Sequence, residues 1–154
     1  MEFYFTERFI DEFKKIIKAK EHKNLENCFI EEIFKKTFDE ILKTGASRQS
    51  GDNNNSAYIK KRIGKLNSGK RGGYRSYIMI LIKNKELYFI FIHPKAGRRS
   101  MVKLDSNEEQ KIIKKFKSEK KLKNLIRVEL LNAADNNPDK TDKIINSETK
   151  HCIF

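Results

Sequence analysis

The sequence predicts one domain in which helices and strands occupy separate stretches of the chain. Apolar residues recur at three- and four-residue spacing in the N-terminal third, which is typical of amphipathic helices. The middle third holds three strand-like runs, and a further helical pattern follows them. A chain of 154 residues, with 38% hydrophobic and 10% aromatic residues, is long enough for one such domain with its own core.

The N-terminal third predicts a short strand and two helices. The aromatic run 3–5 can form an edge strand, and Thr6 is expected to cap a helix that continues to about residue 20. A second broad apolar face extends from 25 to 42, with Cys28 among its core residues. We expect both helices to act as scaffold.

Three strands are expected after a polar loop at 46–56. They cover 57–63, 74–82 and 87–93, and the last two are joined by a hairpin at 83–86. In the run 87–93 the alternate residues on both faces are apolar, so we expect a central strand covered on each side.

The C-terminal part predicts one more helix and a tail. Ser106 and Glu109 match a capping box, which predicts a helix to about Leu122. Residues 125–131 fit a short strand or helix, and 132–154 are polar enough to form a loosely held tail.

Charge is the strongest signal in the composition. The chain has a net charge of +13, and the segment 58–103 holds thirteen basic residues against the single acid Glu86. The other residues comprise 21 Lys or Arg and 20 Asp or Glu, so the positive field belongs to one region. Because like charges placed together destabilise a compact protein, this concentration indicates a polyanionic partner.

Nucleic acid is favoured over a membrane surface as that partner. The basic segment predicts strands and turns, without an amphipathic helix that would insert an apolar face into lipid. Neither a signal peptide nor an apolar run long enough to span a membrane is apparent. The two cysteines, Cys28 and Cys152, form no CxxC pair and are expected to be reduced thiols in a cytoplasmic protein.

The stretch Gly69–Arg75 has two interpretations. Gly72 and Gly73 can take a positive φ and expose backbone N–H groups beside Lys70, Arg71 and Arg75, which suits a phosphate. The same residues also fit an ordinary turn ahead of a strand.

The chemistry that the basic segment can support is limited. Its only metal-ligating types are Glu86 and His93, without paired ligand spacing, and no serine lies in a nucleophile elbow. RNA supplies its own nucleophile, the 2′-hydroxyl, so cations that align it with the adjacent phosphorus are sufficient for cleavage. We therefore expect no metal and no small-molecule cofactor.

The basic segment and its surroundings resemble a known family. The order of the aromatic run 3–5, the helices, Lys61-Arg62-Ile63, the glycine-rich stretch 69–75, and 88–95 followed by Arg98 is similar to the HigB-like branch of the RelE superfamily of toxins from bacterial toxin–antitoxin pairs. The resemblance implies an α+β fold, with N-terminal helices, a small antiparallel sheet and a C-terminal helix. Because it covers roughly Phe3 to Lys123, we expect a toxin domain at 1–123 and a partly ordered extension at 124–154.

The resemblance also implies a function and its residues. It implies an endoribonuclease, or mRNA interferase, that inhibits translation by cutting mRNA on the ribosome in the cytoplasm, and a cognate antitoxin of helix-turn-helix type that neutralises it. Arg75 and Arg98 are expected to clamp the phosphate, with Lys70 or Lys95 as the proton-transfer group. The remaining cations are expected to bind RNA: Lys60, Lys61, Arg62, Arg71 and Arg99.

Two other functions remain open from the sequence. One is a nucleic-acid-binding or gyrase-inhibiting toxin of the same superfamily that does not cleave RNA. The other is a degenerate toxin retained for its contact with the antitoxin. His93 can serve as an acid or base near neutral pH, or it can be a packed residue at the end of a strand.

Overall fold

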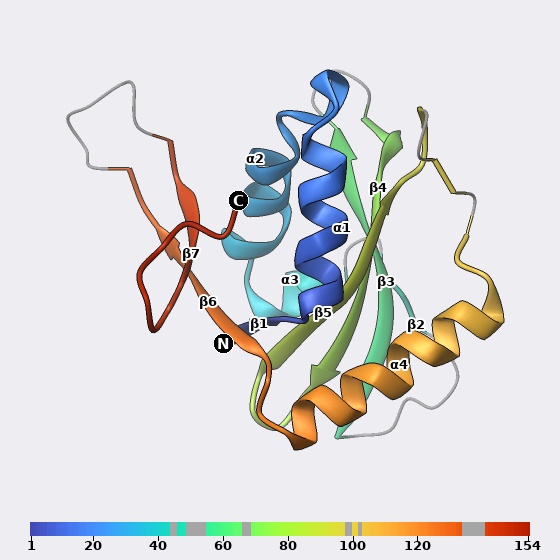
Figure 1. The fold of residues 1–154 in the computed structure, drawn as a ribbon, viewed down its shortest axis with the longest axis vertical. Helices are drawn as coiled ribbons and strands as arrows, with labels where there is room; N and C mark the ends of the chain where they lie inside the picture. The colour runs from blue at the N-terminus through green and yellow to red at the C-terminus, as the bar shows by residue number, and fades with distance from the viewer. Residues whose placement is uncertain (44–45, 49–54, 66–68, 98–99, 102, 134–140) are drawn as a thin grey trace.

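A seven-stranded mixed sheet forms the centre of the molecule (Figure 1). The computed structural model describes residues 1–43, 46–48, 55–65, 69–97, 100–101, 103–133 and 141–154, with backbone alone at 46–48 and 69–71. The strands are β1 (Glu2–Phe5), β2 (Ala46–Arg48), β3 (Ser56–Lys65), β4 (Gly69–Leu81), β5 (Glu86–Pro94), β6 (Ile126–Leu131) and β7 (Lys143–Asn146). Their order is β2-β3-β4-β5-β1-β6-β7, and all neighbours are antiparallel except β1 and β5.

Helices cover both faces of this sheet, which confirms the α+β class. Helices α1 (Glu7–Ile17), α2 (Leu25–Phe29) and α3 (Phe38–Lys43) pack on one face, and α4 (Ser106–Lys121) lies across the other (Figure 1). A 3₁₀ turn (Lys20–His22) and a π-helical turn (Ile30–Phe34) connect the N-terminal helices. The larger core, on the α1 side, includes Phe9 and Phe89, and the smaller, under α4, includes Tyr88 and Phe116.

The first strand is an interior strand, so the expected edge position was wrong. β1 lies between β5, to which it is parallel, and β6. The residues that follow it behave as predicted: the Thr6 hydroxyl accepts a hydrogen bond of 3.1 Å from the Phe9 N–H and caps α1. Helix α1 packs on β5, where the Phe9 ring contacts the Phe89 ring.

The second predicted helix is interrupted between Phe34 and Phe38. Thr37 starts a new helix there, because its hydroxyl accepts from the Glu40 N–H at 3.3 Å while the Glu40 carboxylate accepts from the Thr37 N–H at 2.8 Å. This reciprocal pair is a capping box. The continuous apolar periodicity concealed it, although the Thr-x-x-Glu signal is present in the sequence.

β5 is the predicted central strand, with one difference. It is buried along nearly its whole length and lies between β4 and β1. The register with β4 shifts between Tyr77 and Ile78, so Phe91 joins Ile90 in the core under α4, whereas Ile92 joins the larger core. The bulge therefore exchanges the faces that simple alternation assigned to Phe91 and Ile92.

The glycine-rich stretch is part of strand β4 and does not form the expected turn. Gly97 is the only glycine in the described residues with a positive φ, so Gly72 and Gly73 do not use that freedom. A Cβ on Gly73 would overlap the Ile63 carbonyl oxygen, next to a register shift between Ile63 and Lys65. Glycine is required here because two backbones approach closely.

The C-terminal residues 141–154 are packed against the domain, where the sequence predicted a loosely held tail. β7 pairs with β6, the Glu26 carboxylate accepts from the Ile144 N–H at 3.2 Å, and Phe154 stacks on Phe13 with ring centroids 3.8 Å apart. The expected boundary between 1–123 and 124–154 stays a prediction.

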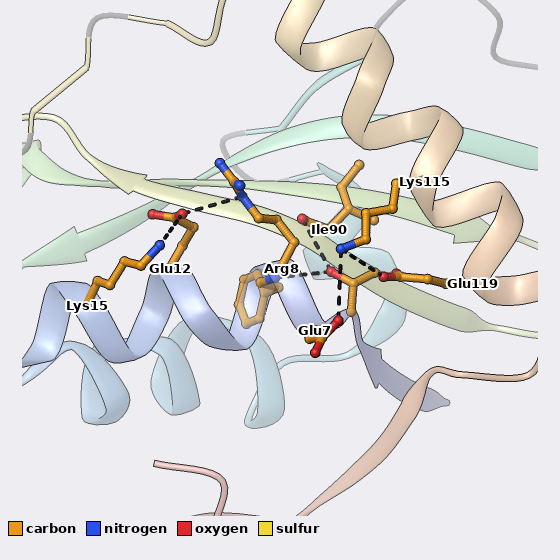
Figure 2. A network of polar contacts seen from close by, with 9 residues as sticks. Glu7, Arg8, Glu12, Lys15, Ile90, Lys115 and Glu119 are labelled. Atoms are coloured by element: carbon orange, nitrogen blue, oxygen red, sulfur yellow. Dashed lines mark hydrogen bonds and ion pairs between the residues drawn. The ribbon is translucent and has the colours of Figure 1, made fainter.

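Helix α4 begins one residue earlier than a Ser106 cap would give. Asp105 is the N-cap and accepts from the Asn107 N–H at 3.3 Å, so the predicted Ser106–Glu109 capping box was wrong. Lys115 of α4 forms ion pairs with Glu119 on the same helix at 3.6 Å and with Glu7 of α1 at 3.9 Å (Figure 2). None of the helices in the described ranges is long and apolar enough to cross a membrane.

Candidate nucleic-acid interface

Two arginines stand opposite each other on the face of the sheet that carries α4. Alternation from Tyr58 on β3 and from Tyr77 on β4, both in the core under α4, places Arg62 and Arg75 on that same face. The two arginines are direct partners in the antiparallel register, and Arg75 is in turn the partner of His93 on β5. We call Arg62 and Arg75 the arginine pair.

The arginine pair is an unfavourable arrangement for an isolated sheet. Directly opposite side chains have Cβ atoms roughly 4.5–5.5 Å apart, and like charges at this spacing destabilise the pairing. Arg62 is exposed and Arg75 half-buried, so an anion can approach the pair from solvent. A phosphate group would compensate the repulsion and match the planar donors of a guanidinium.

His93 lies beside the arginine pair but is a packed residue. Its side chain is 2% exposed, and its Nδ1 lies 3.0 Å from the Pro94 carbonyl oxygen. A carbonyl can only accept, so Nδ1 carries the hydrogen and Nε2 accepts from the Tyr77 hydroxyl at 3.3 Å. Burial, with the charges of Arg75 and Lys95, lowers the pKa of His93, which favours the neutral imidazole.

Tyr77 connects this histidine to the segment that leads into α4. Its hydroxyl accepts from the Leu104 N–H at 3.1 Å while it donates to His93. Burial raises the pKa of Tyr77, although the hydrogen bond from Leu104 and the Arg75 guanidinium oppose the shift. The Tyr77 and His93 side chains beside the arginine pair are therefore neutral and held in place by hydrogen bonds.

Lys60 precedes Arg62 by two residues on β3, lies on the same face of the sheet, and is held by a residue of α4. Its Nζ lies 3.0 Å from the Glu109 carboxylate and 5.4 Å from the centroid of the Tyr77 ring. The same carboxylate accepts from the Tyr58 hydroxyl at 2.7 Å, and burial with this contact raises the pKa of Tyr58. Glu109 thus joins α4 to the basic face.

The other predicted site residues differ in where the structure places them relative to the arginine pair. Lys95 is half-buried, and its N–H donates to the Gly73 carbonyl at 2.9 Å, which brings it beside the strand that carries Arg75. Lys61 is 1% exposed and alternates to the opposite face, so it does not join the interface. Lys70 and Arg71 belong to β4 without described side chains, and Arg98 and Arg99 lie outside the described residues.

Sequence reasoning missed Tyr58, Tyr77 and Glu109. The tyrosines carry a usable signal, because each lies two residues from a cation of the basic segment and must share its face in a strand. The sequence signal at Glu109 was misleading, because Glu109 fits a capping box with Ser106. In the described part of the chain, no cluster of three or more His, Cys, Asp or Glu side chains is placed to hold a metal ion.

Comparison with known families agrees with the resemblance drawn from the basic segment. The model of the RelE toxin of RelE/RelB toxin–antitoxin systems matches residues 14–133. The chain belongs to the RelE toxin family. No curated protein and no solved structure matches the chain significantly.

The match to the RelE toxin family spans the whole candidate interface. It includes β3, β4, β5, α4 and β6, whereas β1 and β7 lie outside it. The chain is thus a toxin of the type that is paired with an antitoxin. Its placement in the HigB-like branch stays a prediction.

Proposed function

We propose that this RelE family toxin is a ribosome-dependent endoribonuclease that stops translation by cutting mRNA without a metal ion. The single observation that carries the proposal is the arginine pair, two cations in register on an accessible face of the sheet. Family membership supports RNA cleavage as the activity. The ribosome would present the mRNA in the cytoplasm.

The reaction needs two proton transfers and charge stabilisation. The 2′-oxygen of the RNA forms a bond to the adjacent phosphorus and loses its proton to a base, while the bond from phosphorus to the 5′-oxygen breaks and that oxygen takes up a proton. Arg75 and Arg98 would clamp the phosphate and stabilise its added negative charge. Arg62, the cross-strand partner of Arg75, would contact the same phosphate. The products are a 2′,3′-cyclic phosphate and a 5′-hydroxyl.

Lys95 or Lys70 would carry the proton. The hydrogen bond from the Lys95 N–H to Gly73 places this residue close to the strand of Arg75. Neighbouring cations disfavour a charged ammonium and so make a lysine a better base. His93 is a weaker candidate, because it is buried and both its nitrogens have protein partners.

The remaining cations of the basic face would hold the RNA on either side of the arginine pair. Lys60, Arg71 and Arg99 would bind the RNA backbone on either side of the scissile phosphate. The proposed antitoxin is a helix-turn-helix protein that covers the basic face and keeps the toxin inactive.

Induced expression of the toxin tests this function. We expect growth arrest, with new 5′-hydroxyl ends inside coding sequences of translated mRNA and none when initiation is blocked. Coexpression of the proposed antitoxin should restore growth. Arrest with intact transcripts would contradict the proposal, and DNA breaks under that arrest would indicate a gyrase inhibitor instead.

A further inference from the structure

The buried Tyr77 side chain adjoins one member of the arginine pair. Tyr77 follows Arg75 by two residues on the same face of β4, and its ring packs in the core under α4. The Tyr77 hydroxyl accepts a hydrogen bond from the Arg75 guanidinium. A half-buried cation that faces the proposed path of the RNA is therefore bonded to a group inside the core.

The Tyr77 hydroxyl uses its whole hydrogen-bonding capacity. A hydroxyl has one hydrogen to donate and two lone pairs with which to accept. Tyr77 donates to Nε2 of His93 at 3.3 Å, and it accepts from the Leu104 N–H at 3.1 Å as well as from Arg75. Nε2 of His93 must be the acceptor, because Nδ1 donates to the Pro94 carbonyl oxygen. The hydrogen of Tyr77 thus points at His93, and its lone pairs are left for Leu104 and Arg75.

The bond to Tyr77 makes the two arginines of the pair different. A long side chain that is free in solvent loses rotamer freedom when it binds a ligand. Arg75 has already lost part of that freedom, and the remaining donors of its guanidinium are available to a phosphate. Arg62 is exposed and has to be ordered when the RNA binds.

The ring and the hydroxyl of Tyr77 have separate partners. The centroid of the ring lies 5.4 Å from Nζ of Lys60 and 5.8 Å from the centroid of the Phe91 ring. Neither contact uses the hydroxyl. Tyr77→Phe therefore keeps the packing and the contact with Lys60 and removes the hydrogen bonds, among them the one from Arg75.

We propose that Tyr77 is a positioning residue, whose hydroxyl holds the Arg75 guanidinium in the orientation that meets the scissile phosphate. Tyr77 contacts neither the RNA nor the reacting atoms and acts through Arg75. A charge that is oriented in advance needs no reorganisation in the transition state. The inference rests on the proposed function for its effect on cleavage, whereas the hold on Arg75 belongs to the free protein.

Single-turnover cleavage of mRNA on ribosomes tests the effect of the hydroxyl. Tyr77→Phe should lower the maximal rate about tenfold and leave the half-saturating toxin concentration within about twofold, because a misplaced charge acts chiefly in the transition state. In an Arg75→Ala background the same substitution should change the rate by less than about twofold. Equal losses in both backgrounds, or no loss in the wild-type background, would overturn the inference.

Tyr88→Phe is the matched control for this experiment. Tyr88 belongs to the same core, but its hydroxyl donates to Glu86 at the opposite end of β5 from His93. The substitution therefore removes a hydroxyl from the core under α4 without touching Arg75. Tyr88→Phe should cleave at the wild-type rate.

NMR of the arginine side chains separates the hold on Arg75 from the nuclease activity. In the wild-type toxin without RNA, the guanidinium N–H resonances of Arg75 should show slow rotation and those of Arg62 fast averaging. Arg75→Lys and Arg62→Lys assign these resonances. Tyr77→Phe should make Arg75 average as Arg62 does, and Tyr88→Phe should not.

The wild-type comparison requires neither cleavage nor a folded variant. Slow rotation of Arg75 in a protein that cuts no RNA would support the hold and contradict the proposed function. Equal averaging of Arg75 and Arg62 in the wild type would overturn the inference, even if the toxin cuts RNA. Unchanged Arg75 resonances in folded Tyr77→Phe would overturn it as well.

Discussion

Arg62 on β3 and Arg75 on β4 are direct cross-strand partners on the face of the sheet that carries α4. Like charges in directly opposite positions disfavour strand pairing, so this register is unexpected unless the two side chains share a function. The helix-covered opposite face holds Lys61 buried, so the accessible positive charge of β3 is on the arginine side. This arrangement suits the polyanionic partner that we propose.

Removal of Arg62 should weaken RNA binding in a salt-dependent manner. Arg62→Ala removes one phosphate contact, so the slope of log K against log salt for single-stranded RNA should become shallower by about 0.7. The measurement is a titration of a short RNA at several salt concentrations. Lys83→Ala, an exposed cation in the hairpin before β5, is the control and should leave the slope unchanged.

Gly73→Ala should destabilise the fold strongly. The new Cβ would overlap the Ile63 carbonyl oxygen, and strands β3 and β4 would have to separate locally. We expect a loss of about 1–3 kcal/mol or more in the free energy of unfolding, measured with urea. At Gly64 the nearest atom to a Cβ is the Glu32 carboxylate at 3.7 Å, so Gly64→Ala should cost much less; equal losses would contradict the account.

Loss of Glu109 should loosen α4. Glu109→Ala leaves the Tyr58 hydroxyl and the Lys60 ammonium without their acceptor, and both are largely buried. The free energy of unfolding should fall by about 1–3 kcal/mol. Glu108→Ala removes an exposed contact to Lys111 on the same helix and should change stability by less than about 0.5 kcal/mol.

The two buried histidines should make stability dependent on pH. Burial lowers the pKa values of His22 and His93 below their ordinary value of 6.5. Below pH 6.5 these histidines therefore bind protons in the unfolded chain but remain neutral in the folded chain until the pH reaches their folded pKa values. Their contribution is therefore complete above pH 6.5 and decreases as the pH falls towards the folded pKa values. Each can add a slope of up to about 1.4 kcal/mol per pH unit.

Unfolding midpoints of His93→Asn between pH 5 and 8 provide the measurement. The variant should show a shallower loss of stability on acidification than the wild type. His151→Asn, at an exposed position, serves as the control. A wild-type slope in His93→Asn would show that His93 is protonated equally in both states.

Local sequence signals predicted the elements whose structure depends on neighbouring residues. Thr6 caps α1 because its hydroxyl needs only the next turn of helix. The apolar run of β5 predicted a central strand, because a strand that is buried on both faces is apolar at nearly every residue. The family was also evident, since it depends on the order of the basic and glycine-rich segments.

Features that depend on distant pairing could not be predicted in the same way. Gly72 and Gly73 carry a turn signal, yet they lie within strand β4, whose residues on either side, Gly69 and Tyr74, pair with β3. Ile144 and Phe154 lie in a polar segment of the sequence. Pairing with β6 and contacts with Phe5 and Phe13 bring them into the larger core. The register that opposes Arg62 and Arg75 likewise follows from strand pairing. Alternation alone, however, separates Lys60 from Lys61.

The most direct test is cleavage of a defined mRNA in a purified translation system by the wild-type toxin, Arg75→Ala and Lys83→Ala. The account predicts that Arg75→Ala lowers the single-turnover cleavage rate by about 10²–10³-fold, because a charge-stabilising group is lost in the transition state. Lys83→Ala should cleave at the wild-type rate, and the thermal unfolding of both variants should match the wild type within a few degrees. Cleavage by Arg75→Ala at the wild-type rate would contradict the role of the arginine pair.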